Sequence, residues 1–165
     1  MKLRSCPRRL TQQGGSRGCS FVNTTVPLPV LLSAPHRSPS VSLLSSLQSF
    51  LMTGQGMDEA GAAACVAQAL ALPTDWDMGY VAMGKAGRTE ATTVQVRELQ
   101  AFTAVLLGAA NVYGAGGKAG QATQPTVAVT QAMVQAIAAS LASACNTGGT
   151  VNLAKQSTLQ SLMSG

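Results

Sequence analysis

The sequence predicts an all-α protein, a small Ala-rich bundle of about four helices that follows a disordered N-terminal leader. Three observations support this fold class. Residues 57–165 contain 25 Ala and two Pro, and Ala is the strongest helix former. Apolar side chains in this region recur at steps of three and four, as on one face of a helix. Pro, Gly or Asn follows the periodic stretches, where helices commonly end.

Residues 1–56 have a different composition, with one Ala, ten Ser and five of the seven Pro. An Arg-containing, Ser-rich segment without acidic residues is typical of a transit peptide, which predicts import into a chloroplast or mitochondrion. A secretory signal with its apolar part at residues 21–34 is the alternative. A third interpretation is a disordered tail, or an upstream region of a doubtful gene model. We therefore divide the chain into a disordered or cleavable leader, 1–56, and an Ala- and Gln-rich helical domain, 57–165.

The helices are expected in this order. Within the leader, the spacing of Leu44, Leu47 and Leu51 predicts a short amphipathic helix over residues 41–52. The first helix of the domain is expected over residues 57–72. Asp58 and Glu59 would lie in its first turn, where the helix dipole favours negative charge, and Pro73 would end it. Between residues 74 and 92 a loop is expected, in which 80–83 and 94–96 would at most pair as a marginal hairpin.

Three further helices follow, at residues 93–113, 124–145 and 150–163. Each has an apolar face that we expect to point into the core. For the second helix of the domain this face consists of Leu99, Phe102, Leu106, Ala109 and Tyr113. For the third it consists of Val127, Val134, Ile137, Leu141 and Ala144. For the fourth it consists of Val151, Ala154, Leu159 and Leu162, after Thr150 as a predicted N-cap.

The net charge of +5 comes from the leader, which has six basic residues and no acid, whereas residues 57–165 have five basic and six acidic residues. Nucleic-acid binding needs several cations acting together, so the domain composition argues against it. Ala buries little apolar area per residue, so the core of an Ala-rich domain contributes little stabilisation. We therefore expect the domain to bury further apolar surface against a second copy or another protein. No run of about 18 apolar residues occurs, so no transmembrane span is expected. No pattern indicates a small-molecule ligand.

The domain also lacks the residue patterns of catalytic and metal sites. The single His, His36, belongs to the leader, which excludes a His-activated nucleophile in the domain. No Cys-x-x-Cys pair occurs, and Asp75 and Asp77 are not followed by the remaining ligands of a calcium loop. The Gly-rich segment 114–120 departs from the phosphate-loop pattern. We therefore predict no catalytic residue, no metal and no cofactor.

Cys65 and Cys145 are the two thiols of the domain. Each lies on a small-residue face of a predicted helix, where a free thiol behaves as a small apolar group. The alternative is a disulfide between Cys65 and Cys145, which would join the first helix of the domain to the third. Export to an oxidising compartment would favour that bond.

These observations predict a small non-enzymatic helical module for self-association or protein–protein interaction. One alternative is a secreted or wall-associated structural protein that carries the Cys65–Cys145 disulfide. The other is the product of a doubtful gene model without a defined activity.

Overall fold

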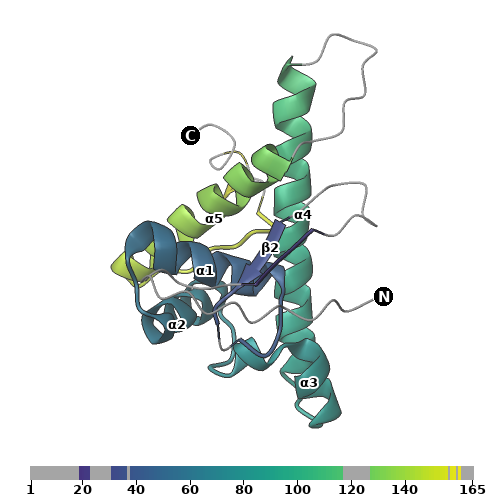
Figure 1. Ribbon diagram of the computed structural model, residues 1–165, viewed down its shortest axis with the longest axis vertical. Helices are drawn as coiled ribbons and strands as arrows, with labels where there is room; N and C mark the ends of the chain where they lie inside the picture. Colours follow the sequence, from purple (N-terminus) through teal and green to yellow (C-terminus); the bar gives the residue numbers. More distant parts are fainter. Residues whose placement is uncertain are drawn as a thin grey trace.

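The computed structural model describes residues 19–22, 31–36, 38–116, 127–155, 157–158 and 160, and within these residues the protein is mostly helical, as predicted (Figure 1). A two-stranded hairpin precedes five α-helices and one short 3-10 helix. In chain order the elements are β1 (Cys19–Val22), β2 (Leu31–Ala34), α1 (Leu43–Gln55), α2 (Glu59–Leu70), η1 (Trp76–Met78), α3 (Tyr80–Lys85), α4 (Ala91–Gly116) and α5 (Val127–Thr147).

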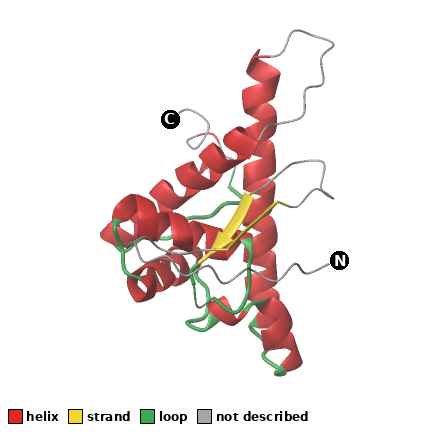
Figure 2. Cartoon of the chain, viewed as in Figure 1, coloured by secondary structure: helices red, strands yellow, loops and turns green. Residues whose placement is uncertain are grey.

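The longest helix, α4, runs along one side of the molecule, with α1, α2 and α5 beside it and α3 at one end (Figures 1 and 2). Helix α1 contacts α2, α4 and α5, so it lies at the centre of the packing. The antiparallel strands β1 and β2 were not predicted, and β2 lies along α1 (Figure 2). The backbone N–H of Ser33 in β2 donates to the hydroxyl of the buried Ser46 in α1, at 2.9 Å.

Helix α1 lies within the segment that the sequence analysis assigned to the leader. The helix predicted there from the leucine spacing is confirmed, and Ser42 caps it by accepting from the backbone N–H of Ser45. Four leucines of this helix are at most 2% exposed and belong to the same core as α2 and α5: Leu43, Leu44, Leu47 and Leu51. The change in composition at residue 57 is therefore not an edge of the packed structure. Cleavage near residue 57 stays a prediction, and it would remove α1 from the core.

Helices α2, α4 and α5 confirm three of the helices predicted for the domain. The carboxylate of Asp58 accepts from the backbone N–H of Gly61 at 2.7 Å and caps α2, which ends at Ala71 in the left-handed conformation (φ 51°). On α5, the predicted core residues Val134, Ile137 and Leu141 are at most 1% exposed.

Two local details differ from the expectations. The segment 74–92, expected as a loop, contains η1 and α3. The marginal hairpin does not form, since residues 80–83 belong to α3 and residues 94–96 to α4. The predicted fourth helix does not begin at Thr150: residues 150–155 form loop and turn, whereas residues 157, 158 and 160 are helical. Tertiary contacts explain this: the Val151 backbone N–H donates to the Ala69 carbonyl of α2 at 2.7 Å, and Leu153 is buried. Leu159 and Leu162 lie outside the described residues.

The predicted core face of α4 is correct at Ala109, which is buried, and wrong at Leu99, which is 58% exposed. The core-facing positions are taken mainly by small residues, and the others among them were not predicted: Ala101, Ala104 and Val105. The physical reason is close packing against α5, because a Cβ added at Gly108 would overlap the thioether of Met133. The predicted core residues Phe102 and Leu106 are half-buried, and the side chain of Tyr113 lies outside the described residues.

Candidate functional site

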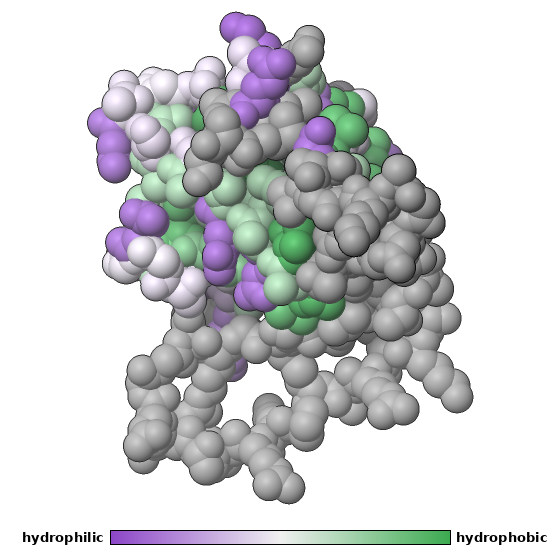
Figure 3. Space-filling model, turned by 90° about the horizontal axis from the view of Figure 1, so that it is seen from above, coloured by the Kyte–Doolittle hydropathy of each residue, from purple (hydrophilic) through white to green (hydrophobic). Residues whose placement is uncertain are grey.

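The large apolar side chains that are exposed in the described part of the chain fall into two groups. One group lies along α4, and the other surrounds a groove beside α3. Patches of hydrophobic surface also stand among hydrophilic ones in the space-filling view (Figure 3). Large exposed apolar groups that gather in one place indicate interaction sites more strongly than scattered ones do.

The first group belongs to a row on α4 that we call the α4 stripe: Val96, Leu99, Thr103, Leu107 and Ala110. Its positions advance by three, four, four and three residues, so they share one side of the helix. Val96, Leu99 and Leu107 are 44%, 58% and 44% exposed. No charged residue occurs between Leu99 and the end of α4. A helix side turned to water normally carries charge, so this composition is typical of a contact surface.

The second group surrounds a groove with a volume of about 360 Å³, which we call the α3 groove. It is formed by the segment before α1, by η1, by α3 and by the first turns of α4. The segment before α1 is held against η1 by the Ser40 hydroxyl, which donates to the Asp77 carbonyl at 3.3 Å. Trp76 lines the groove while its indole N–H donates to the Ala63 carbonyl of α2 at 3.1 Å. The groove therefore has a fixed aromatic wall.

A half-buried carboxyl group, Glu98, also lines the α3 groove. Its Oε1 accepts from the backbone N–H of Leu43 at 2.7 Å, at the first residue of α1, where a helix favours negative charge. Burial raises the pKa of the Glu98 carboxyl, while the hydrogen bonds from the Leu43 backbone and the Ser42 hydroxyl act in the opposite direction. This group therefore has a structural role, linking α4 to the start of α1.

The other charged cluster consists of one Arg and two acidic residues that pair with each other. Arg88 pairs with Asp75 at 2.6 Å and with Glu90 at 3.4 Å, and all three side chains are partly exposed. Exposed pairs of this kind contribute little to stability. Within the residues that the structure covers, no group of three His, Cys, Asp or Glu side chains could hold a metal ion. The sequence analysis predicted no catalytic, metal or cofactor residue, and this stays a prediction.

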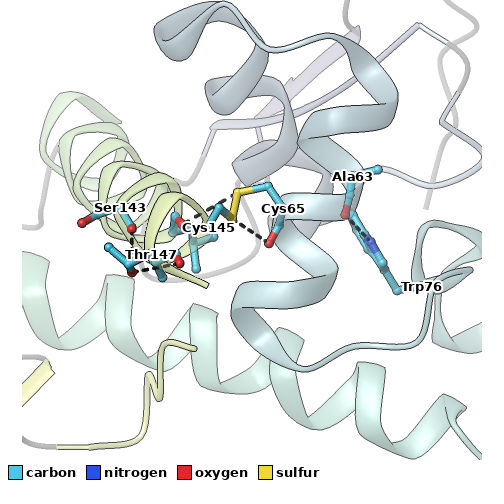
Figure 4. The surroundings of a disulfide bond; sticks show 8 residues. Ala63, Cys65, Trp76, Ser143, Cys145 and Thr147 are labelled. Atoms are coloured by element: carbon cyan, nitrogen blue, oxygen red, sulfur yellow. Dashed lines mark hydrogen bonds between the residues drawn. A yellow bond between two sulfur atoms is a disulfide. The ribbon is translucent and has the colours of Figure 1, made fainter. Parts of the chain in front are cut away.

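Cys65 of α2 and Cys145 of α5 form a disulfide, with their Cα atoms 5.5 Å apart (Figure 4). The structure thus contains the pairing that the sequence analysis weighed against two free thiols. The Sγ of Cys145 lies 3.2 Å from the Cys65 carbonyl oxygen, and the Sγ of Cys65 lies 3.7 Å from the Leu141 carbonyl oxygen. After reduction each thiol would have a carbonyl acceptor within reach, so the packing of α2 on α5 accommodates both redox states. The redox state in the native source stays a prediction.

Two further sequence observations have a place in the structure. The Gly-rich segment 114–120 begins inside α4, which extends to Gly116, and residues 117–120 lie outside the described part. Among the described helices, α5 alone is long and apolar enough to cross a membrane by length and composition. Seven of its residues are buried in the core, and the core helix of a globular protein passes the same test. The expectation of no transmembrane span therefore stays a prediction.

No protein-family model, curated protein or solved structure matches the chain. The functional argument therefore depends on the surfaces described above. Sequence reasoning placed Leu99 in the core and so missed the α4 stripe. The sequence feature that could have indicated this surface is the stretch without charged residues after Glu98. Such a stretch is found both in helices buried in a core and in helices that contact another protein.

Proposed function

We propose that this protein is a non-enzymatic helical module that associates with a second copy of itself through the α4 stripe. The observation that carries the proposal is the orientation of α4, with small residues such as Ala104 packed inside and Leu99 and Leu107 outside. This arrangement leaves three large apolar side chains of the helix, those of Val96, Leu99 and Leu107, exposed to a partner.

The stripe suits a second copy for two reasons. Its steps of three and four residues are those of the seam between paired helices, in which side chains of one helix fit between those of the other. It also carries no charge, so two identical stripes meet without repulsion and without needing a complementary set of charges. A twofold contact between identical surfaces is the commonest form of protein self-association.

The test compares two variants by sedimentation velocity over a range of protein concentrations. Leu99→Glu places a carboxylate in the stripe, whereas Gln135→Glu places the same group at an exposed position of α5, outside the stripe. Each buried Leu contributes about 1.5 kcal/mol or more, and the dimer loses two of them. We expect Leu99→Glu to weaken the dimer on the order of 100-fold and Gln135→Glu to leave it unchanged. A wild-type chain that stays monomeric at all concentrations would overturn the proposal.

A second candidate function is that of a secreted or wall-associated structural protein, and the Cys65–Cys145 disulfide favours it. Disulfides persist in oxidising compartments and are rare in the cytosol. The alternative location is an organelle reached through a transit segment in residues 1–56. The intact mass of protein from the native source, alkylated without reductant, separates the two. No alkylation of Cys65 and Cys145 supports export, whereas a chain that begins near residue 57 with both thiols alkylated supports organelle import.

A further inference from the structure

The α3 groove has features that self-association does not use. Four of the exposed large apolar residues lie around it, at 37–56% exposure: Val41, Met78, Tyr80 and Val81. They come from three different parts of the chain, the segment before α1, η1 and the start of α3. A groove of about 360 Å³ lies within the size range of small-molecule sites, which are mostly apolar and have a few polar groups.

The two charged residues of the groove differ in how they are used. Glu98 is half-buried, and its Oε1 already accepts from the Leu43 backbone N–H at the start of α1, so this carboxyl group is engaged within the protein. Lys85, at the end of α3, is exposed and makes no ion pair or hydrogen bond with any residue in the described part of the chain. The charge that the groove offers to a ligand is therefore positive.

We propose that the α3 groove binds a single-chain amphipathic anion, such as a medium-chain carboxylate. The hydrocarbon chain lies among Val41, Met78 and Val81, and the carboxylate pairs with the ammonium group of Lys85. Hydrocarbon burial supplies most of the affinity, because an exposed ion pair contributes little by itself. Longer chains bind more tightly until the groove is filled, by about fourfold for each added methylene.

Trp76 makes a direct test practical, because it is the single Trp of the chain and it lines the groove. Fluorescence of the full chain is followed during titration with decanoate below its micelle concentration. We expect a saturable change with decanoate, and binding about 15-fold weaker with octanoate, which is two methylenes shorter. Decyltrimethylammonium, with the same chain and the opposite charge, should bind more weakly than decanoate.

The variant Lys85→Glu tests the charge. We expect it to weaken decanoate binding about tenfold and to reverse the preference between decanoate and decyltrimethylammonium. The control is Lys155→Glu, which makes the same change at an exposed position outside the groove and should leave both affinities unchanged. The proposal is overturned if decanoate gives no saturable change, if the cation binds wild type as tightly, or if the two variants behave alike.

Discussion

Reducing the Cys65–Cys145 disulfide should cost a large part of the stability of this protein. The bond joins residues separated by 80 positions in the sequence, and in the unfolded chain it closes a loop of that length. The chain-entropy relation for such a loop gives about 4.5 kcal/mol at 25 °C. A domain of this size has a total free energy of unfolding of about 5–15 kcal/mol. Reduction should therefore remove about 30% or more of the total.

The assay is urea unfolding followed by far-ultraviolet circular dichroism, with and without a phosphine reductant. The double variant Cys65→Ala/Cys145→Ala is the control, because Cys6 and Cys19 also occur in the chain. We expect the reductant to lower the unfolding free energy of wild type by about 4 kcal/mol and to leave that of the double variant unchanged. A loss below about 1 kcal/mol in wild type would refute the loop argument, because a loop of this length cannot be closed so cheaply.

Three other predictions concern the core and the half-buried carboxyl group of Glu98. Leu47→Ala, at a position with no exposed surface, should lower the unfolding free energy by about 2–5 kcal/mol in urea titrations; an unchanged value would show that α1 does not belong to the core. Gly108→Val should cost about 1–3 kcal/mol because its side chain displaces Met133, and an unchanged unfolding free energy would contradict the packing of α4 on α5. Because the folded-state pKa of Glu98 is raised above its ordinary value of 4.5, this group contributes stability that is present below pH 4.5 and is lost as the pH rises through the folded pKa. The unfolding free energy of wild type should thus fall with rising pH relative to that of Glu98→Gln, and parallel pH profiles would contradict this.

The helical elements could be predicted from the sequence because their signals are local. Helix α2 lies between a capping Asp58 and Pro73, and α5 has Val134, Ile137 and Leu141 at helical spacing. The helix over residues 41–52 was predicted from the same kind of spacing. Its place in the core was not, because the surrounding Ser and Pro residues suggested a leader. Burial of α1 depends on its leucines and on the partners they meet, and composition does not identify those partners.

The candidate surfaces could not be predicted for a related reason. Helix α4 has apolar residues on most of its sides, so periodicity alone does not decide whether Leu99 or Ala104 faces the core. The close approach of α5 at Gly108 decides it, and that approach is a tertiary property. The α3 groove likewise combines residues about 40 positions apart, Val41 and Val81, which no local pattern connects.

The most direct test of self-association through α4 is site-specific photo-crosslinking of the full chain. A benzophenone side chain is placed at position 99 in one preparation and at position 135, an exposed position of α5, in another, and both are irradiated at the same protein concentration. We predict a covalent species of twice the 16.8 kDa chain mass from position 99, and little or none from position 135. Equal yields from the two positions, or no dimer from position 99 at a concentration where the chain sediments as a dimer, would contradict the account.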